Sequence, residues 1–131
     1  MKPAYRSSHN VVYSSKYRLM WCPKYRRKVL VGAVKTRLVE IVRQVCAEHQ
    51  VEIIGSEVMP DHVHLLAEVD PSFGVSGLVR LVKGRSSRIL RQDFVHLRRL
   101  PMLWTNSWFC STVGGAPLPV VRRYVENQKV A

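Results

Sequence analysis

Met59-Pro60-Asp61-His62-Val63-His64-Leu65-Leu66 lies in the middle of the chain, between two apolar runs. In an extended strand, alternate side chains project to the same face. His62 and His64 would therefore point one way, while Val63 and Leu65 would point the other way into a core. The preceding Pro60-Asp61 favours a turn, so the two histidines are expected at the start of a strand.

Two imidazoles on one sheet face can supply half of a metal site. The simpler interpretation is that they are two polar residues on a solvated face, because short motifs give many false positives. The motif alone leaves both interpretations open, and the rest of the chain has to decide between them.

Length and composition predict one folded domain over residues 1–131. The chain has 131 residues and 47% hydrophobic residues, which suits a single core. Lys or Arg interrupts every apolar run, and the N-terminus lacks the apolar stretch of a signal peptide, so we expect a cytoplasmic protein with no membrane partner. The three cysteines, Cys22, Cys46 and Cys110, are far apart and are expected to be reduced.

The charge is the strongest global signal. Twenty-one Lys and Arg face nine Asp and Glu, which gives a net charge of +12, and no acidic residue precedes Glu40. A positive field of this size favours a polyanionic partner, most often nucleic acid. The alternative is a surface that is merely solubilising.

Two basic clusters are candidates for phosphate contacts. One is a run with Tyr25 inside it, whose ring could stack on a base, although a solvated loop would look the same. The other lies on a predicted helix, on the side away from Leu78 and Val82, with no acidic partner on that face. The residues expected to bind nucleic acid are Lys24, Arg26, Arg27, Lys28, Arg80, Lys83, Arg88 and Arg91.

The order of predicted elements indicates an α+β fold. Residues up to Asn10 are expected to form an arm, and Ser76 is expected to cap the second helix. Strands are predicted at 13–22, 51–59, 62–69 and 104–113, and helices at 34–49, 76–92 and 119–128. This β-α-β-β-α-β order is typical of ferredoxin-like and RRM-like domains, with an antiparallel sheet and both helices on one face. Residues 116–131 would form a C-terminal helix hinged at Gly114-Gly115.

Tyr124 and Gln128 are four residues apart on this last helix and would share one face. Spacing alone equally allows Tyr124 to pack in the core. Two imidazoles and an amide oxygen could hold Mg²⁺ or Mn²⁺ against a phosphodiester. A tyrosine hydroxyl is a competent nucleophile toward that phosphate and would give a covalent phosphotyrosine.

With these residues assembled, the sequence resembles the single-tyrosine HUH transposases of the smallest bacterial insertion sequences, in which U is a hydrophobic residue. The likeness runs from about residue 13 to the end of the chain. The matching motifs are Trp21-Cys22-Pro23-Lys24-Tyr25-Arg26-Arg27-Lys28-Val29-Leu30, the histidine stretch at 59–66, Ser111-Thr112-Val113-Gly114-Gly115, and Tyr124-Val125-Glu126-Asn127-Gln128.

The resemblance implies specific roles. His62, His64 and Gln128 would be the metal ligands, and Tyr124 would be the nucleophile that joins to a 5′ phosphate. The substrate would be single-stranded DNA at element ends, marked by imperfect hairpins and a short guide sequence. Members of this family act as homodimers, in which the tyrosine helix of one subunit serves the histidine pair of the other, in trans.

Two alternatives stay open from the sequence. The same order of elements builds non-catalytic RRM-like modules that bind RNA or DNA, although those carry stacking aromatics on the central strands, where this chain has two histidines. A domesticated or replication-initiating relative with the same nicking chemistry is the second. The hairpin and cleavage-site sequences are not encoded in a readable way.

Overall fold

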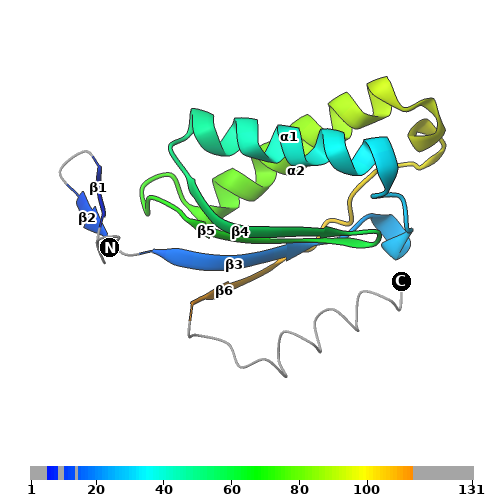
Figure 1. The fold of residues 1–131 in the computed structure, drawn as a ribbon. Coiled ribbons are helices and arrows are strands. Elements are labelled where there is room, and N and C mark those ends of the chain that lie inside the picture. Colours follow the sequence, from blue (N-terminus) through cyan, green and yellow to red (C-terminus); the bar gives the residue numbers. More distant parts are fainter. Residues whose placement is uncertain (1–5, 9–10, 14, 114–131) are drawn as a thin grey trace.

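The computed structural model describes residues 6–8, 11–13 and 15–113, and its centre is a four-stranded antiparallel sheet. The strands are β3 (Lys16–Trp21), β4 (Glu52–Met59), β5 (His62–Glu68) and β6 (Phe109–Thr112), in the spatial order β4-β5-β3-β6. Both long helices, α1 (Gly32–Glu48) and α2 (Val75–Asp93), cover the same face of this sheet (Figure 1). The predicted ferredoxin-like architecture is confirmed.

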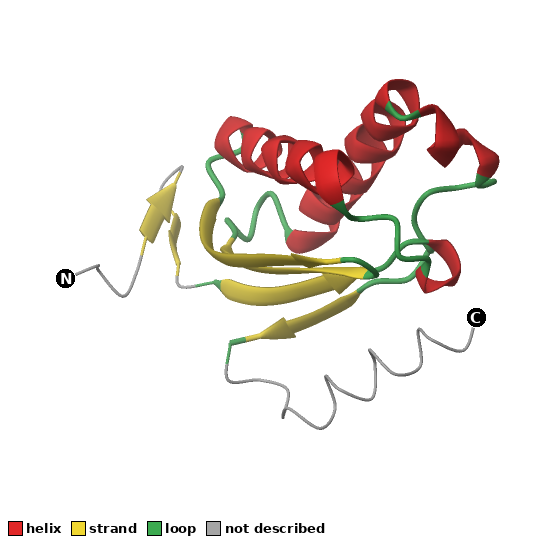
Figure 2. Ribbon diagram, turned by 45° about the vertical axis from the view of Figure 1, so that its right-hand side comes forward, coloured by secondary structure: helices red, strands yellow, loops and turns green. Residues whose placement is uncertain are grey.

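One core fills the space between the helix layer and the sheet layer, which Figure 2 shows from a second direction. Leu19 and Trp21 of β3 and Leu65 of β5 point into it and are fully buried. Leu38 and Ile41 of α1 meet them from above, also fully buried. Each such side chain contributes about 1.5–3 kcal/mol relative to exposure, so the alternating strands and the amphipathic helices stabilise each other.

The N-terminal region differs from the expected arm. β1 (Arg6–Ser8) and β2 (Val11–Tyr13) pair as a separate two-stranded antiparallel sheet. The first strand of the main sheet therefore begins at Lys16 and not at Tyr13, because Tyr13 is paired with Arg6. The composition of residues 6–13 favours β-strands, but composition alone does not show that the two short segments pair with each other.

The last strand is shorter than the predicted 104–113. Only Phe109–Thr112 pairs with β3. Trp104 makes an isolated bridge to Pro23, and the backbone carbonyl of Thr105 accepts a hydrogen bond from the Lys83 ammonium at 2.6 Å. This segment is therefore fastened to α2 and to the loop after β3 before it reaches the sheet.

The start of the second helix also departs from the prediction. α2 begins at Val75, and the cap position is held by Gly74 with φ 81, while Ser76 lies inside the helix. A short 3-10 helix, η2 (Val95–Arg99), follows α2. In the described residues, no helix is long and apolar enough to cross a membrane. The predicted last helix, its joint at Gly114-Gly115 and the boundary at residue 116 lie outside the described residues.

A buried hydrogen bond ties the segment before β6 to α2. The indole N–H of Trp104 donates to the hydroxyl of Ser86 at 2.9 Å, and both side chains are buried. Trp104 also packs edge-to-face on Trp21, with ring centroids 6.3 Å apart. Ser86 thus connects the helix layer to the largest aromatic pair of the core.

We expect Ser86→Ala to leave the Trp104 indole N–H buried without an acceptor and to lower the free energy of unfolding by about 1–3 kcal/mol. Urea denaturation measures the change. Ser87→Ala, at the next helix position, is the matched control and should shift the free energy of unfolding by less than about 0.5 kcal/mol. Equal losses in the two variants would show that the hydrogen bond is not the source of the effect.

Candidate functional site

His62 and His64 lie on the face of β5 that points away from the helices. Both are half-buried, while Val63 and Leu65 between and after them are buried in the core. The alternation therefore places the two imidazoles on one face, as the sequence pattern predicts. β5 is paired on both sides, with β4 and with β3, so the backbone that carries the histidines is held at both edges.

His64 has a buried ring nitrogen that makes no hydrogen bond within the described part of the chain. Its cross-strand neighbours are Met20 on β3 and Glu57 on β4, and its Nε2 is the atom without a partner. Burial lowers the pKa of His64, and the positive charge of Arg18 lowers it further, although Glu57 acts in the opposite direction. The ring is thus favoured in the neutral form, which is the form that binds a metal.

His62 is oriented by a carboxylate. Its Nδ1 lies 2.9 Å from Oδ1 of Asp61, and the other carboxylate oxygen of Asp61 accepts a hydrogen bond from Nη2 of Arg26 at 2.6 Å. Burial alone would raise the pKa of Asp61, but the hydrogen bonds and charges of His62 and Arg26 outweigh it and lower that pKa. An ionised Asp61 can only accept, so in the neutral ring Nδ1 carries the proton and Nε2 keeps its lone pair.

The loop after β3 holds Arg26 in this position. Tyr25 and Arg26, in the 3-10 turn η1 (Lys24–Arg26), have φ of 58° and 49°, a left-handed conformation that costs a non-glycine residue about 1–3 kcal/mol. Backbone hydrogen bonds fix the loop at both ends: Lys24 N–H donates to Leu103 C=O at 2.8 Å and Leu30 N–H to Pro60 C=O at 3.0 Å. The second bond joins the loop directly to the turn that precedes the histidines.

The residues of the basic run around Tyr25 therefore differ in role: one supports the fold near the histidines, and others face the solvent. The side chain of Arg26 is only 6% exposed and is occupied by Asp61, so it serves the histidine pair in place of the phosphate contact predicted for it. Arg27 and Lys28 are exposed. Tyr25 is 53% exposed, with Lys24 Nζ 5.2 Å and Arg27 Cζ 5.9 Å from its ring centroid.

The four cations predicted on α2 do not form one free face. Arg80 and Arg88 are exposed, but the other two reach the segment that follows the helix. Lys83 donates to the carbonyl of Thr105, and Arg91 donates through Nη2 to the carbonyl of Leu100 at 2.9 Å. Helical spacing places all four near one another, but it does not show that two of them donate hydrogen bonds to backbone carbonyls of the segment after the helix.

In the described residues, no group of three His, Cys, Asp or Glu side chains is arranged to hold a metal ion. A metal ion on the histidine pair would therefore need a further ligand of another type or from elsewhere. The predicted third ligand Gln128 and the predicted nucleophile Tyr124 lie outside the described residues.

The orienting pair Arg26 and Asp61 was missed as part of the site. Asp61 was interpreted as turn chemistry, although its position directly before His62 was a usable signal. Arg26 is 35 residues away in sequence, and only the folded loop brings it to the carboxylate.

Known proteins resemble this chain over most of its length. Residues 11–128 match the family described as IS200-like transposases. The ISDra2 transposase TnpA of Deinococcus radiodurans is 36% identical over 126 residues, which is 94% of this chain and 90% of the relative. The transposase for insertion sequence element IS200 of Salmonella typhimurium is 32% identical over 119 residues, 88% of this chain and 78% of the relative.

Solved structures agree with these sequence relatives. The crystal structure of a candidate transposase from Deinococcus radiodurans R1 has a TM-score of 0.82 at 33% identity and covers 94% of this chain and 97% of its own. A REP-associated tyrosine transposase bound to a REP hairpin shares the fold, with a TM-score of 0.56 at 17% identity, over 92% of this chain and 68% of its own. The motif resemblance stated from the sequence is confirmed, and the chain belongs to the IS200-like transposase family.

Proposed function

We propose that this transposase cleaves and rejoins single-stranded DNA at the ends of an insertion sequence through a covalent 5′-phosphotyrosine on Tyr124. The observation that carries the proposal is the state of the histidine pair. Nε2 of His64 is buried without a hydrogen-bond partner among the described residues, and His62 is held by a carboxylate that leaves its own Nε2 available. Two histidines that only face solvent would need neither a buried, unpaired ring nitrogen nor an orienting carboxylate.

His62, His64 and Gln128 would hold Mg²⁺ or Mn²⁺, which when bound would polarise a phosphoryl oxygen and stabilise charge in the transition state. The donors present fit such an ion, because ligating histidines are usually oriented through their second ring nitrogen by a carboxylate. The Asp61 carboxylate occupies that position for His62, and Arg26 holds Asp61 in turn.

The tyrosine supplies the covalent chemistry in this proposal. The phenolic oxygen of Tyr124 forms a bond to phosphorus and loses its proton, while the bond from phosphorus to the 3′ oxygen breaks and that oxygen takes up a proton. The strand then ends in a free 3′ hydroxyl, and the 5′ phosphate is joined to the protein. Attack by another 3′ hydroxyl on the same phosphorus restores a phosphodiester and frees Tyr124, so no external energy source is needed.

The proposed partners follow from charge and family. A net charge of +12 on 131 residues favours a phosphate backbone. We infer a single strand with hairpin ends as the substrate, and a homodimer in which Tyr124 of one subunit completes the histidine pair of the other. The exposed cations Arg27, Lys28, Arg80 and Arg88 remain candidate phosphate contacts.

The first test is adduct formation by Tyr124→Phe. A labelled, hairpin-bearing single strand should become covalently attached to the unaltered chain with Mg²⁺ or Mn²⁺, and gel electrophoresis under denaturing conditions detects the product. Tyr124→Phe should abolish the adduct and leave binding of the strand largely unchanged, because only the nucleophilic oxygen is lost. An adduct that persists would refute Tyr124 as the nucleophile, whereas normal binding with no adduct from the unaltered chain would favour a non-catalytic module.

The second test addresses the orientation of His62. Asp61→Asn removes the negative acceptor from Nδ1, and we expect Mn²⁺ affinity to fall about 10- to 100-fold by isothermal titration calorimetry. Glu48→Gln is the matched control, because it removes the carboxylate from another arginine pair, Glu48 Oε1 to Arg85 Nη2 at 2.8 Å, on the helix layer. Unchanged Mn²⁺ affinity in a folded Asp61→Asn chain would contradict the role of Asp61.

The third test is the titration of His64. Its pKa should lie below the ordinary value of 6.5, which NMR of the metal-free protein can measure. As pH falls below 6.5, the unfolded chain takes up a proton that native His64 refuses, so this residue should reduce the free energy of unfolding until its native pKa is reached. His64→Gln should remove this part of the pH dependence. A native pKa at or above 6.5 would contradict the buried, neutral ring.

A further inference from the structure

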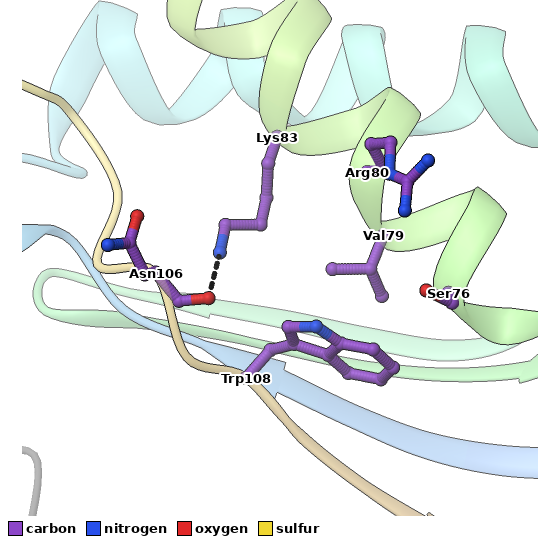
Figure 3. A pocket seen from close by; sticks show the side chains of 6 residues that line it. All are labelled: Ser76, Val79, Arg80, Lys83, Asn106 and Trp108. Atoms are coloured by element: carbon purple, nitrogen blue, oxygen red, sulfur yellow. Dashed lines mark hydrogen bonds between the residues drawn. The ribbon is translucent and has the colours of Figure 1, made fainter.

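A hollow of about 240 Å³ lies between α2 and the segment that leads into β6 (Figure 3). Its described lining includes neither His62 nor His64. Its described lining contains two cations, one aromatic ring and one amide, and no carboxylate. The lining residues are Ser76, Val79, Arg80, Lys83, Asn106 and Trp108.

Trp108 forms one side of the hollow. Its indole lies across from Val79, with Arg80 and Ser76 on the helix beside it (Figure 3). The ring is half-buried, whereas Trp21 and Trp104 are buried in the core. Trp108 is thus the tryptophan whose ring can accept a flat ligand from outside.

Lys83 fixes the opposite wall. Its ammonium donates to the carbonyls of Thr105 and Asn106 at 2.6 Å and 3.5 Å, which leaves one of its three N–H donors for a ligand. The two bonds also hold the backbone that presents Trp108. Arg80 is exposed at the hollow, so its guanidinium is open to a phosphate.

This set of groups matches the parts of a nucleotide. An aromatic ring offers a stacking surface for any base, and a cation beside it offers a contact for the phosphate. A partner with acidic character is favoured because both charges of the lining are positive.

The hollow lies beside the start of β6, and one row of paired residues leads from β6 to the histidines. Phe109 pairs with Met20, and Met20 pairs with His64, so these three residues share a row across β6, β3 and β5. Trp108 is the neighbour of Phe109 and lies on the helix side of the sheet. The hollow and the histidines therefore lie on opposite faces of the sheet, and a DNA strand that occupies both would pass around the edge strand β6.

We propose that this hollow binds one unpaired nucleotide of the DNA strand, with the base stacked on Trp108 and the phosphate held by Arg80. The inference rests on the proposed function for the identity of the strand, and it assigns to the transposase a contact away from His62 and His64. Lys83 acts as a positioning residue that keeps the Trp108 segment against α2.

The experiment uses the full chain without added metal. Titration with a short oligothymidylate should quench tryptophan fluorescence, and the same sugar–phosphate strand with abasic positions should not. Trp108→Ala should weaken oligothymidylate binding about tenfold or more, while Trp108→Phe, which keeps an aromatic ring, should retain most of the affinity. Arg80→Gln should reduce the slope of log affinity against log salt by about 0.7, the value for one contact to a single strand.

Arg43→Gln is the control for charge, because Arg43 is an exposed arginine on α1 and is not part of the hollow. It should leave the salt slope and the quenching unchanged. Equal quenching by the abasic strand, or equal loss in Arg80→Gln and Arg43→Gln, would overturn the proposal. Adduct formation is assayed separately: an adduct without quenching refutes the nucleotide site alone, and quenching without an adduct refutes the catalytic proposal alone.

Discussion

The two-residue period of β5 is the constraint on which the rest of the structure depends. β5 is a central strand, and Val63, Leu65 and Ala67 on its inner side are almost fully buried against the helices. A slip of one residue would turn these side chains outward and drive His62 and His64 into the core. The same hydrophobic burial that fixes the register therefore also fixes which face carries the imidazoles.

The next level of organisation comes from cations that serve as structural anchors. Arg26 fastens the loop after β3 to Asp61, and Lys83 and Arg91 fasten the segment after α2 by donating to backbone carbonyls. Each interaction satisfies a group that would otherwise lose its hydrogen bonds on burial. A strongly basic chain thus uses part of its charge internally, and only the remainder, including Arg80 and Arg88, is available at the surface for a partner.

These anchors converge on the two proposed sites. The Arg26–Asp61 pair orients His62, and Lys83 presents Trp108 beside Arg80. His62 lies on a strand that is paired on both sides, whereas Trp108 lies in the segment just before β6, and in each case a charged residue from a distant segment holds the site in place. Catalytic constellations need support of this kind, because a small displacement of a ligand or a stacking ring weakens the interaction sharply.

The sequence by itself determined the order of elements, the shared face of His62 and His64, and the family, because periodicity and local motifs are written in adjacent residues. It did not determine the pairing of Arg26 with Asp61, the use of Lys83 and Arg91 as anchors, or the late start of β6 at Phe109. Those depend on contacts between residues far apart in the chain and on a left-handed turn at Tyr25 and Arg26 that local preferences disfavour. Only the tertiary structure decided them, because the surrounding hydrogen bonds that stabilise such a turn exist only once the sheet and helices have packed.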